Sequence, residues 1–206
     1  TDFDAKAEFR INSIRYTVSA RELLQATTNP VYWLKGPKAT EFILRGRPKD
    51  STGAVSPDLL MQFLVRFSPG AAGARISFEC ENILKTHRQD VIYGVKLYTG
   101  KTTPSLVYSK DSLTHFNMGR WQKIAQWGTT HGEIEIRYDR PYLIATGLVP
   151  RYDTTAIPTE QTITSNYSWW NGSSHDIMQN GIIEKGMGTT GARDDIGPNP
   201  TWVARY

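Results

Sequence analysis

Apolar and polar residues alternate with a period of two along most of this chain. The alternation is clear at positions 9–18, 59–67, 76–81, 91–97 and 133–138. Because successive side chains of a strand point to opposite faces of a sheet, each segment has one face for a core and one for water. The pattern predicts short β-strands, with Cys80 on the core face of one of them.

Turn-forming residues separate these segments, as at Pro69-Gly70, Gly73, Thr99-Gly100 and Gly132. Short strands with such punctuation are typical of an antiparallel sandwich or barrel. The chain has neither a βαβ alternation nor a glycine-rich phosphate loop, which excludes doubly wound and P-loop folds. We therefore predict an all-β fold, an antiparallel β-sandwich.

One stretch has the features of a helix. Ser19 and Glu22 have the spacing of a capping box, and a short run to Ala26 follows before Pro30. We expect two helical turns here, as a connection between strands. The predicted fold contains this one short helix.

The character of the chain changes near Pro150. Positions 151–174 are rich in Thr and Ser, and positions 181–197 are rich in Gly. We predict a β-sandwich over 1–150 and a long irregular C-terminal arm over 151–206. The arm bears Trp169, Trp170 and Trp202, which favours an arm packed on the sandwich over a linker leading into a further domain.

Composition agrees with a folded chain. Of the 206 residues 39% are hydrophobic and 21% charged, so a core can form and a wholly disordered chain is excluded. No apolar run is long enough for a membrane-spanning helix. The net charge is +4, but Lys and Arg are scattered, with Arg45, Arg47 and Lys49 as the longest cluster. This gives no specific nucleic-acid signal and allows a weak attraction to anionic polymers.

Residues with catalytic or metal-binding potential form no recognised spacing. The sequence has no nucleophile elbow, and a single cysteine excludes a disulfide or a Cys-built zinc site. We expect the carboxylate pairs Glu79/Glu81 and Glu133/Glu135 to lie on the exposed face of one strand each, as solvated groups and not as an acid/base couple. We expect no catalytic residue, no metal and no cofactor in this chain alone. The histidines are spread singly over the sequence: His87, His115, His131 and His175.

One segment, positions 113–128, combines aromatic and polar residues that suit a carbohydrate-facing groove. Indole faces stack on sugar rings, while cationic and amide groups hydrogen-bond hydroxyls and carboxylates. The alternative is that Trp121 and Trp127 anchor the core and that Arg120 and Lys123 point outward. The predicted ligand-binding residues of this segment are His115, Arg120, Trp121, Lys123 and Trp127.

A second aromatic and polar cluster surrounds Trp169 and Trp170. Adjacent tryptophans cannot both point into one sheet face. At least one of them should meet another element, a partner or a ligand. We include both in the predicted ligand-binding set.

The two ends of the chain suggest a piece of a longer protein. The sequence begins with Thr1 and carries no signal segment, and it stops at 202–206 in what looks like the middle of an element. We expect the chain to be a processed or excised part of something larger.

Four stretches taken together carry a family resemblance: 33–41, 113–123, 188–198 and 202–206. Their order resembles the N-terminal β-rich region of large, mostly uncharacterised bacterial and phage-associated proteins. In these proteins a β-sandwich precedes a helical toroid, an arrangement similar to exo-acting rhamnogalacturonan lyases. The resemblance implies a β-sandwich that is an accessory region, in a setting of extracellular polysaccharide, and it carries over no catalytic residue.

Two functions follow as expectations. The first is a non-catalytic β-sandwich domain of a larger secreted or surface protein that binds polysaccharide. The second is a structural subunit of a virion, fibre or surface layer, assembling with itself or another protein through the C-terminal arm. Both place the chain outside the cell, at the cell surface or on a virion.

Overall fold

The computed structural model describes residues 2–84, 89–128, 139–148, 158–171 and 175–179. The chain divides into two compact units, Thr1–Gly132 and Glu133–Tyr206. The division falls earlier than the boundary at 150 that the change in composition suggested. The strand predicted at 133–138 lies outside the described residues.

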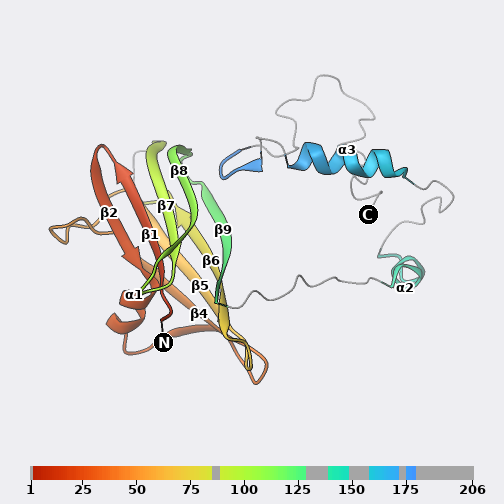
Figure 1. The fold of residues 1–206 in the computed structure, drawn as a ribbon, viewed down its shortest axis with the longest axis horizontal. Helices are drawn as coiled ribbons and strands as arrows, with labels where there is room; N and C mark the ends of the chain where they lie inside the picture. Colours follow the sequence, from red (N-terminus) through yellow and green to blue (C-terminus); the bar gives the residue numbers. More distant parts are fainter. Residues whose placement is uncertain (1, 85–88, 129–138, 149–157, 172–174, 180–206) are drawn as a thin grey trace. The chain divides into compact units, whose positions relative to one another are not determined.

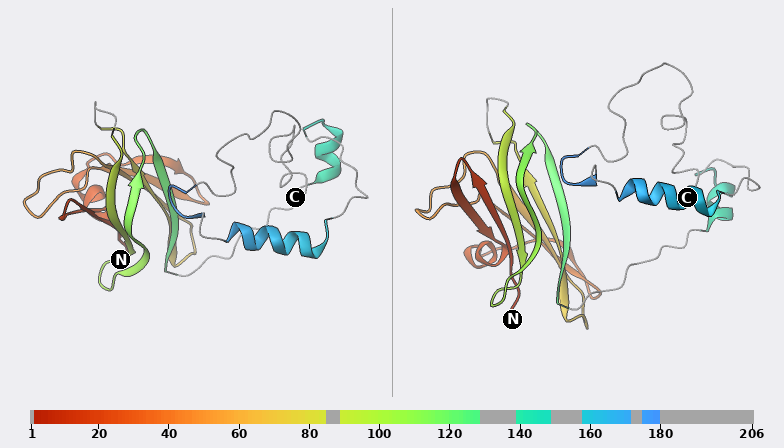
Figure 2. Two further views of the ribbon diagram at one scale, coloured as in Figure 1. Left: turned by 90° about the horizontal axis from the view of Figure 1, so that it is seen from above. Right: turned by 45° about the horizontal axis from the view of Figure 1, so that its top comes forward.

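The first unit contains two antiparallel sheets, which confirms the predicted all-β fold (Figures 1 and 2). The four-stranded sheet has the order β2-β1-β7-β8, formed by Ala5–Ile11 (β1), Ile14–Ser19 (β2), Val91–Thr99 (β7) and Ser105–His115 (β8). The five-stranded sheet has the order β3-β4-β5-β6-β9, formed by Val31–Lys35 (β3), Thr40–Gly46 (β4), Leu60–Phe67 (β5), Gly73–Glu81 (β6) and Arg120–Gly128 (β9).

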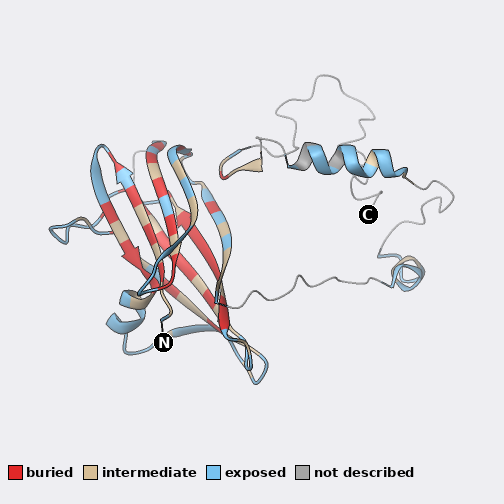
Figure 3. Cartoon of the chain, viewed as in Figure 1, coloured by how far each residue is buried: buried red, intermediate tan, exposed pale blue. Residues whose placement is uncertain are grey.

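The core lies between these sheets and is built from the residues that the alternation assigned to it (Figure 3). In β7 every second residue from Val91 to Thr99 is buried. Edge-to-face ring pairs join Phe9 to Tyr93, at 5.4 Å between centroids, and Phe63 to Phe78, at 5.6 Å. Each of these large side chains contributes roughly 1.5–3 kcal/mol by leaving water.

The predicted helix is also confirmed, as α1 at Ala20–Ala26. The Ser19 side chain accepts a hydrogen bond from the Glu22 backbone N–H, which caps the first turn. Asp4 accepts bonds from the Ser19 hydroxyl at 2.8 Å and from the Arg21 N–H at 3.1 Å. These bonds fix the helix to Asp4, the residue that precedes β1.

The described residues of the second unit form two helices: α2 at Arg140–Ala145, at the end of the region predicted as sandwich, and α3 at Glu160–Trp170, within the predicted irregular arm. Asp139 caps α2, and Thr159 accepts a hydrogen bond from the Thr162 N–H at the start of α3. The α3 sequence is rich in Thr, Ser and Asn, which have low helix propensity, and it shows little apolar periodicity. Because of these two properties, the pattern of the sequence does not predict this helix.

Candidate functional site

The predicted ligand-binding residues do not form one surface. Trp121 pairs with Cys80 across β9 and β6, so it lies on the core face and is only 4% exposed. His115, at the end of β8, is fully buried. These two positions correct the expectation of an exposed groove, because strand register directs both side chains between the sheets. For Trp121 the alternative, a core anchor, is what the structure shows.

Inside the core, His115 and Trp121 meet at the hydroxyl of Tyr93. The His115 Nε2 atom lies 2.9 Å from the Gly119 carbonyl oxygen, so Nε2 carries the proton and donates it. The His115 Nδ1 atom therefore accepts from the Tyr93 hydroxyl, at 2.8 Å. The Trp121 indole N–H donates to the same hydroxyl at 2.7 Å. We call Tyr93, His115 and Trp121 the Tyr93 cluster; all its polar atoms are satisfied internally.

Burial determines the protonation states of this cluster. Desolvation lowers the pKa of His115, although the hydrogen bond to Gly119 and the charge of Asp90 oppose that shift. Desolvation also raises the pKa of Tyr93 and that of the Cys80 thiol. His115, Tyr93 and the neighbouring Cys80 are therefore all uncharged at neutral pH. The Tyr93 cluster thus serves the packing of the sandwich.

The other predicted residues have separate surroundings. The Arg120 side chain is 58% exposed and lies on the outer face of the five-stranded sheet. The Lys123 ammonium is 5.1 Å from the ring centroid of Tyr108, and the Trp127 ring packs edge-on against Phe3 at 5.4 Å. Trp169 and Trp170 end α3, and their side chains lie outside the described residues. A ligand contact by any of them stays a prediction.

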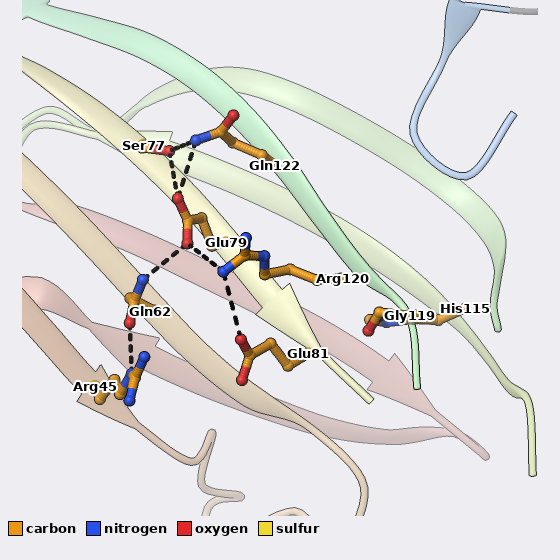
Figure 4. A network of polar contacts seen from close by, with 9 residues as sticks. All are labelled: Arg45, Gln62, Ser77, Glu79, Glu81, His115, Gly119, Arg120 and Gln122. Carbon is orange, nitrogen blue, oxygen red and sulfur yellow. Dashed lines mark hydrogen bonds and ion pairs between the residues drawn. The ribbon is translucent and has the colours of Figure 1, made fainter. Parts of the chain in front are cut away.

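A row of polar residues crosses the outer face of the five-stranded sheet (Figure 4). Strand register aligns Arg45 of β4, Gln62 of β5, Glu79 of β6 and Gln122 of β9. Together with their neighbours these side chains form one connected set, which we call the outer-face network: Arg45, Gln62, Ser77, Glu79, Glu81, Arg120 and Gln122.

Glu79 is the centre of the outer-face network and is only 6% exposed. Its carboxylate accepts hydrogen bonds from Gln62 at 2.8 Å, from Gln122 at 2.9 Å and from Ser77 at 3.3 Å. The Arg120 guanidinium adds an ion pair at 3.7 Å. A buried carboxylate is tolerated when its oxygens are paired in this way, so the network holds this anion in place.

A second feature of the same sheet is its exposed edge strand. Every residue of β3 is exposed, and Trp33 is 69% exposed. The pairing of β3 with β4 is irregular between Tyr32 and Leu34, and a bulge of this kind redirects a side chain. Tyr32 packs on Phe42 at 4.8 Å, with the Lys35 ammonium 4.8 Å from its ring centroid. We call Tyr32 and Trp33 the aromatic edge.

A groove of about 340 Å³ lies between the start of β3, next to the aromatic edge, and Arg45 of the outer-face network. Val31 of β3 lines one part of it and Arg45 of the network another. Its polar groups also include Thr27 and Asn29, just after α1. We call it the α1–β4 groove; its described lining is Leu23, Thr27, Asn29, Pro30, Val31, Ile43, Leu44 and Arg45.

Sequence reasoning missed the aromatic edge and the role of Arg45. The run from Val31 to Leu34 is apolar at each position, so it lacks the alternation of a half-buried strand. The signal that could have found it is the aromatic pair between Pro30 and Pro37, since prolines flank edge strands. Arg45 looked like one of several scattered cations, because its partners lie on other strands.

The described residues include no group of three or more His, Cys, Asp or Glu side chains placed to hold a metal ion. Within the same ranges, no helix has the length and hydrophobicity to cross a membrane. No protein-family model, no curated protein and no solved structure matches the chain.

Proposed function

We propose that this chain is a non-catalytic β-sandwich domain of a larger secreted or surface protein, and that it binds polysaccharide outside the cell. The observation that supports the proposal most directly is the exposure of Trp33 on a strand of the sandwich. Large apolar side chains that gather on a surface mark interaction sites. Val31, Tyr32 and Leu34 extend this exposed surface along β3.

The aromatic edge and the α1–β4 groove have complementary chemistry for sugars. An indole offers a flat apolar face to the C–H side of a pyranose ring. Ligand sites add a few placed polar groups to such apolar surface, as Thr27, Asn29 and Arg45 would here. Because both neighbours of Trp33, Tyr32 and Leu34, are paired with β4, little backbone entropy is lost when a ligand stacks on the indole.

The first prediction is that Trp33→Ala abolishes polysaccharide binding. Affinity electrophoresis through gels containing soluble polysaccharides should retard the wild-type chain, and the variant should migrate as it does in an empty gel. Trp33→Phe should retain part of the retardation because it keeps a smaller ring.

Phe116→Ala is the matched control, since Phe116 is an exposed aromatic residue (52%) that follows β8, away from β3 in the sequence. It should bind as the wild type does. Unchanged retardation of Trp33→Ala in every gel that retards the wild type would contradict the proposed contact.

A structural subunit of a virion, fibre or surface layer is the second candidate. It is favoured by the position of β3 at the edge of its sheet, where an exposed apolar strand can pair with another chain. Light scattering at high concentration separates the two candidates. A stable monomer argues against self-assembly, whereas oligomers that Trp33→Ala disperses would favour it.

A further inference from the structure

One residue of the outer-face network, Arg45, also lines the α1–β4 groove, and its side chain is anchored by a hydrogen bond. The Arg45 Nε–H donates to the Gln62 side-chain oxygen at 2.5 Å, and the Gln62 amide donates in turn to Glu79 at 2.8 Å. Gln62 and Glu79 are both buried, so this chain of bonds ends on groups that are shielded from water. The two Nη groups of Arg45 take part in no hydrogen bond or ion pair with the described residues.

Arg45 is the one charged residue among the described residues that line the groove. The carboxylates of the same sheet face are engaged: Glu79 and Glu81 lie 3.7 and 3.8 Å from Arg120, and Glu41 lies 2.5 Å from Arg66. No acidic side chain is among the described residues that line the groove. The lining therefore combines one cationic residue with apolar residues such as Val31 and Leu23.

We propose that Arg45 binds a carboxylate of an acidic, uronate-bearing polysaccharide whose chain lies in the α1–β4 groove. The proposal rests on the proposed function and names the class of polysaccharide. A guanidinium held through Nε keeps its Nη pair available, and that planar fork matches the two oxygens of a carboxylate. The volume of about 340 Å³ is at the lower end of ligand clefts, roughly 300–1,000 Å³, and suits a short stretch of polymer.

The test uses two pairs of polymers. Within each pair the two members share a backbone and differ in charge. The pairs are polygalacturonate with its methyl ester, and carboxymethylcellulose with hydroxyethylcellulose. Affinity electrophoresis of the full chain should show at least one acidic member bound roughly tenfold more tightly than its neutral partner, as expected of a charge-assisted contact. This preference should weaken with added salt.

Arg45→Gln should reduce the affinity for the acidic polymer to that for the neutral one. Arg45→Lys should give an intermediate value, because it keeps the charge and loses the fork. Arg75→Gln is the matched control: Arg75 lies on the same outer face, paired with Arg66, and does not line the groove. Thermal unfolding of each variant checks that it is folded.

Several results would overturn this inference. Equal binding of the acidic and neutral members of each pair would overturn it. The proposed function would stay intact in that case, because Trp33→Ala would still abolish binding to both polymers. Equal losses in Arg45→Gln and Arg75→Gln would show diffuse charge instead of a site, as would a preference for dextran sulfate over both carboxylated polymers. Absence of binding to any polymer would overturn the proposed function as well.

Discussion

The Tyr93 hydroxyl is the point at which the buried polar groups of the core converge. It accepts from Trp121 and donates to His115, and its oxygen lies 4.0 Å from the Cys80 sulfur. Each partner comes from a different strand, so one hydroxyl connects β6, β7, β8 and β9. Such a network specifies a unique packing because each group would be costly if left unpaired.

Tyr93→Phe should therefore destabilise the fold strongly. It leaves the Trp121 N–H and the His115 Nδ1 atom buried without partners, and each unpaired group costs ~1–3 kcal/mol. We expect a loss of about 2–6 kcal/mol in the free energy of unfolding, measured by urea titration. Tyr98→Phe, on the more exposed face of the same strand, should have almost no effect. Similar losses in both variants would refute this role of the hydroxyl.

At the scale of elements, the strands of the five-stranded sheet have different roles. The central strands β5 and β6 carry core side chains on one face and the base of the outer-face network on the other. The edge strand β3 carries the aromatic edge. The other edge strand, β9, ends at Gly128, whose φ of +78° is typical of glycine. A Cβ there would lie only 2.2 Å from the Ala72 carbonyl oxygen.

Gly128→Ala should consequently weaken the pairing of β9 with β6. Gly53→Ala is a suitable comparison, since Gly53 also has a positive φ, +89°, but has open space around its Cα. The left-handed backbone alone costs roughly 1–2 kcal/mol for alanine. Thermal unfolding should show that cost for Gly53→Ala and a clearly larger one for Gly128→Ala. A lower or equal cost at Gly128 would mean that the backbone of β6 moves without penalty.

At the scale of the whole molecule, the core of the first unit links its stability to pH. Burial lowers the pKa of His115 below the ordinary value of 6.5, so the unfolded chain takes up a proton more readily than the folded one. Stability is then complete above pH 6.5 and falls as the pH drops below it towards the pKa of the folded state. The loss arises because the folded core accommodates only the neutral imidazole.

The prediction is a fall in the melting temperature of the wild type between pH 6.5 and pH 5 that is smaller in His115→Gln. Differential scanning calorimetry of both proteins across this range measures the two melting temperatures. Their difference isolates the effect of His115, because the carboxylates are the same in both proteins. If the two curves run parallel, His115 does not titrate in the unfolding reaction. A steeper fall in the variant would reverse the sign of the argument.

How much of this could be predicted from the sequence depends on the range of the interaction. The buried positions of β7 and the Ser19 cap of α1 follow from neighbours a few residues apart, and both were predicted correctly. Trp121 was predicted to lie on a ligand-binding surface because the segment 113–128 combines aromatic and polar residues. Its position in the strand directs the side chain inward instead. The Thr- and Ser-rich α3 lacked the periodicity that a prediction needs.

The sequence by itself determined the all-β character, the core face of most strands and the position of the first helix, because side-chain period and capping are local properties of the chain. Only the tertiary structure decided which strands are neighbours, and so placed Arg45, Gln62, Glu79 and Gln122 in one row. It also decided that β3 is an edge strand and that Trp33 is exposed. Strand pairing joins residues far apart in the sequence, and no local pattern encodes that choice.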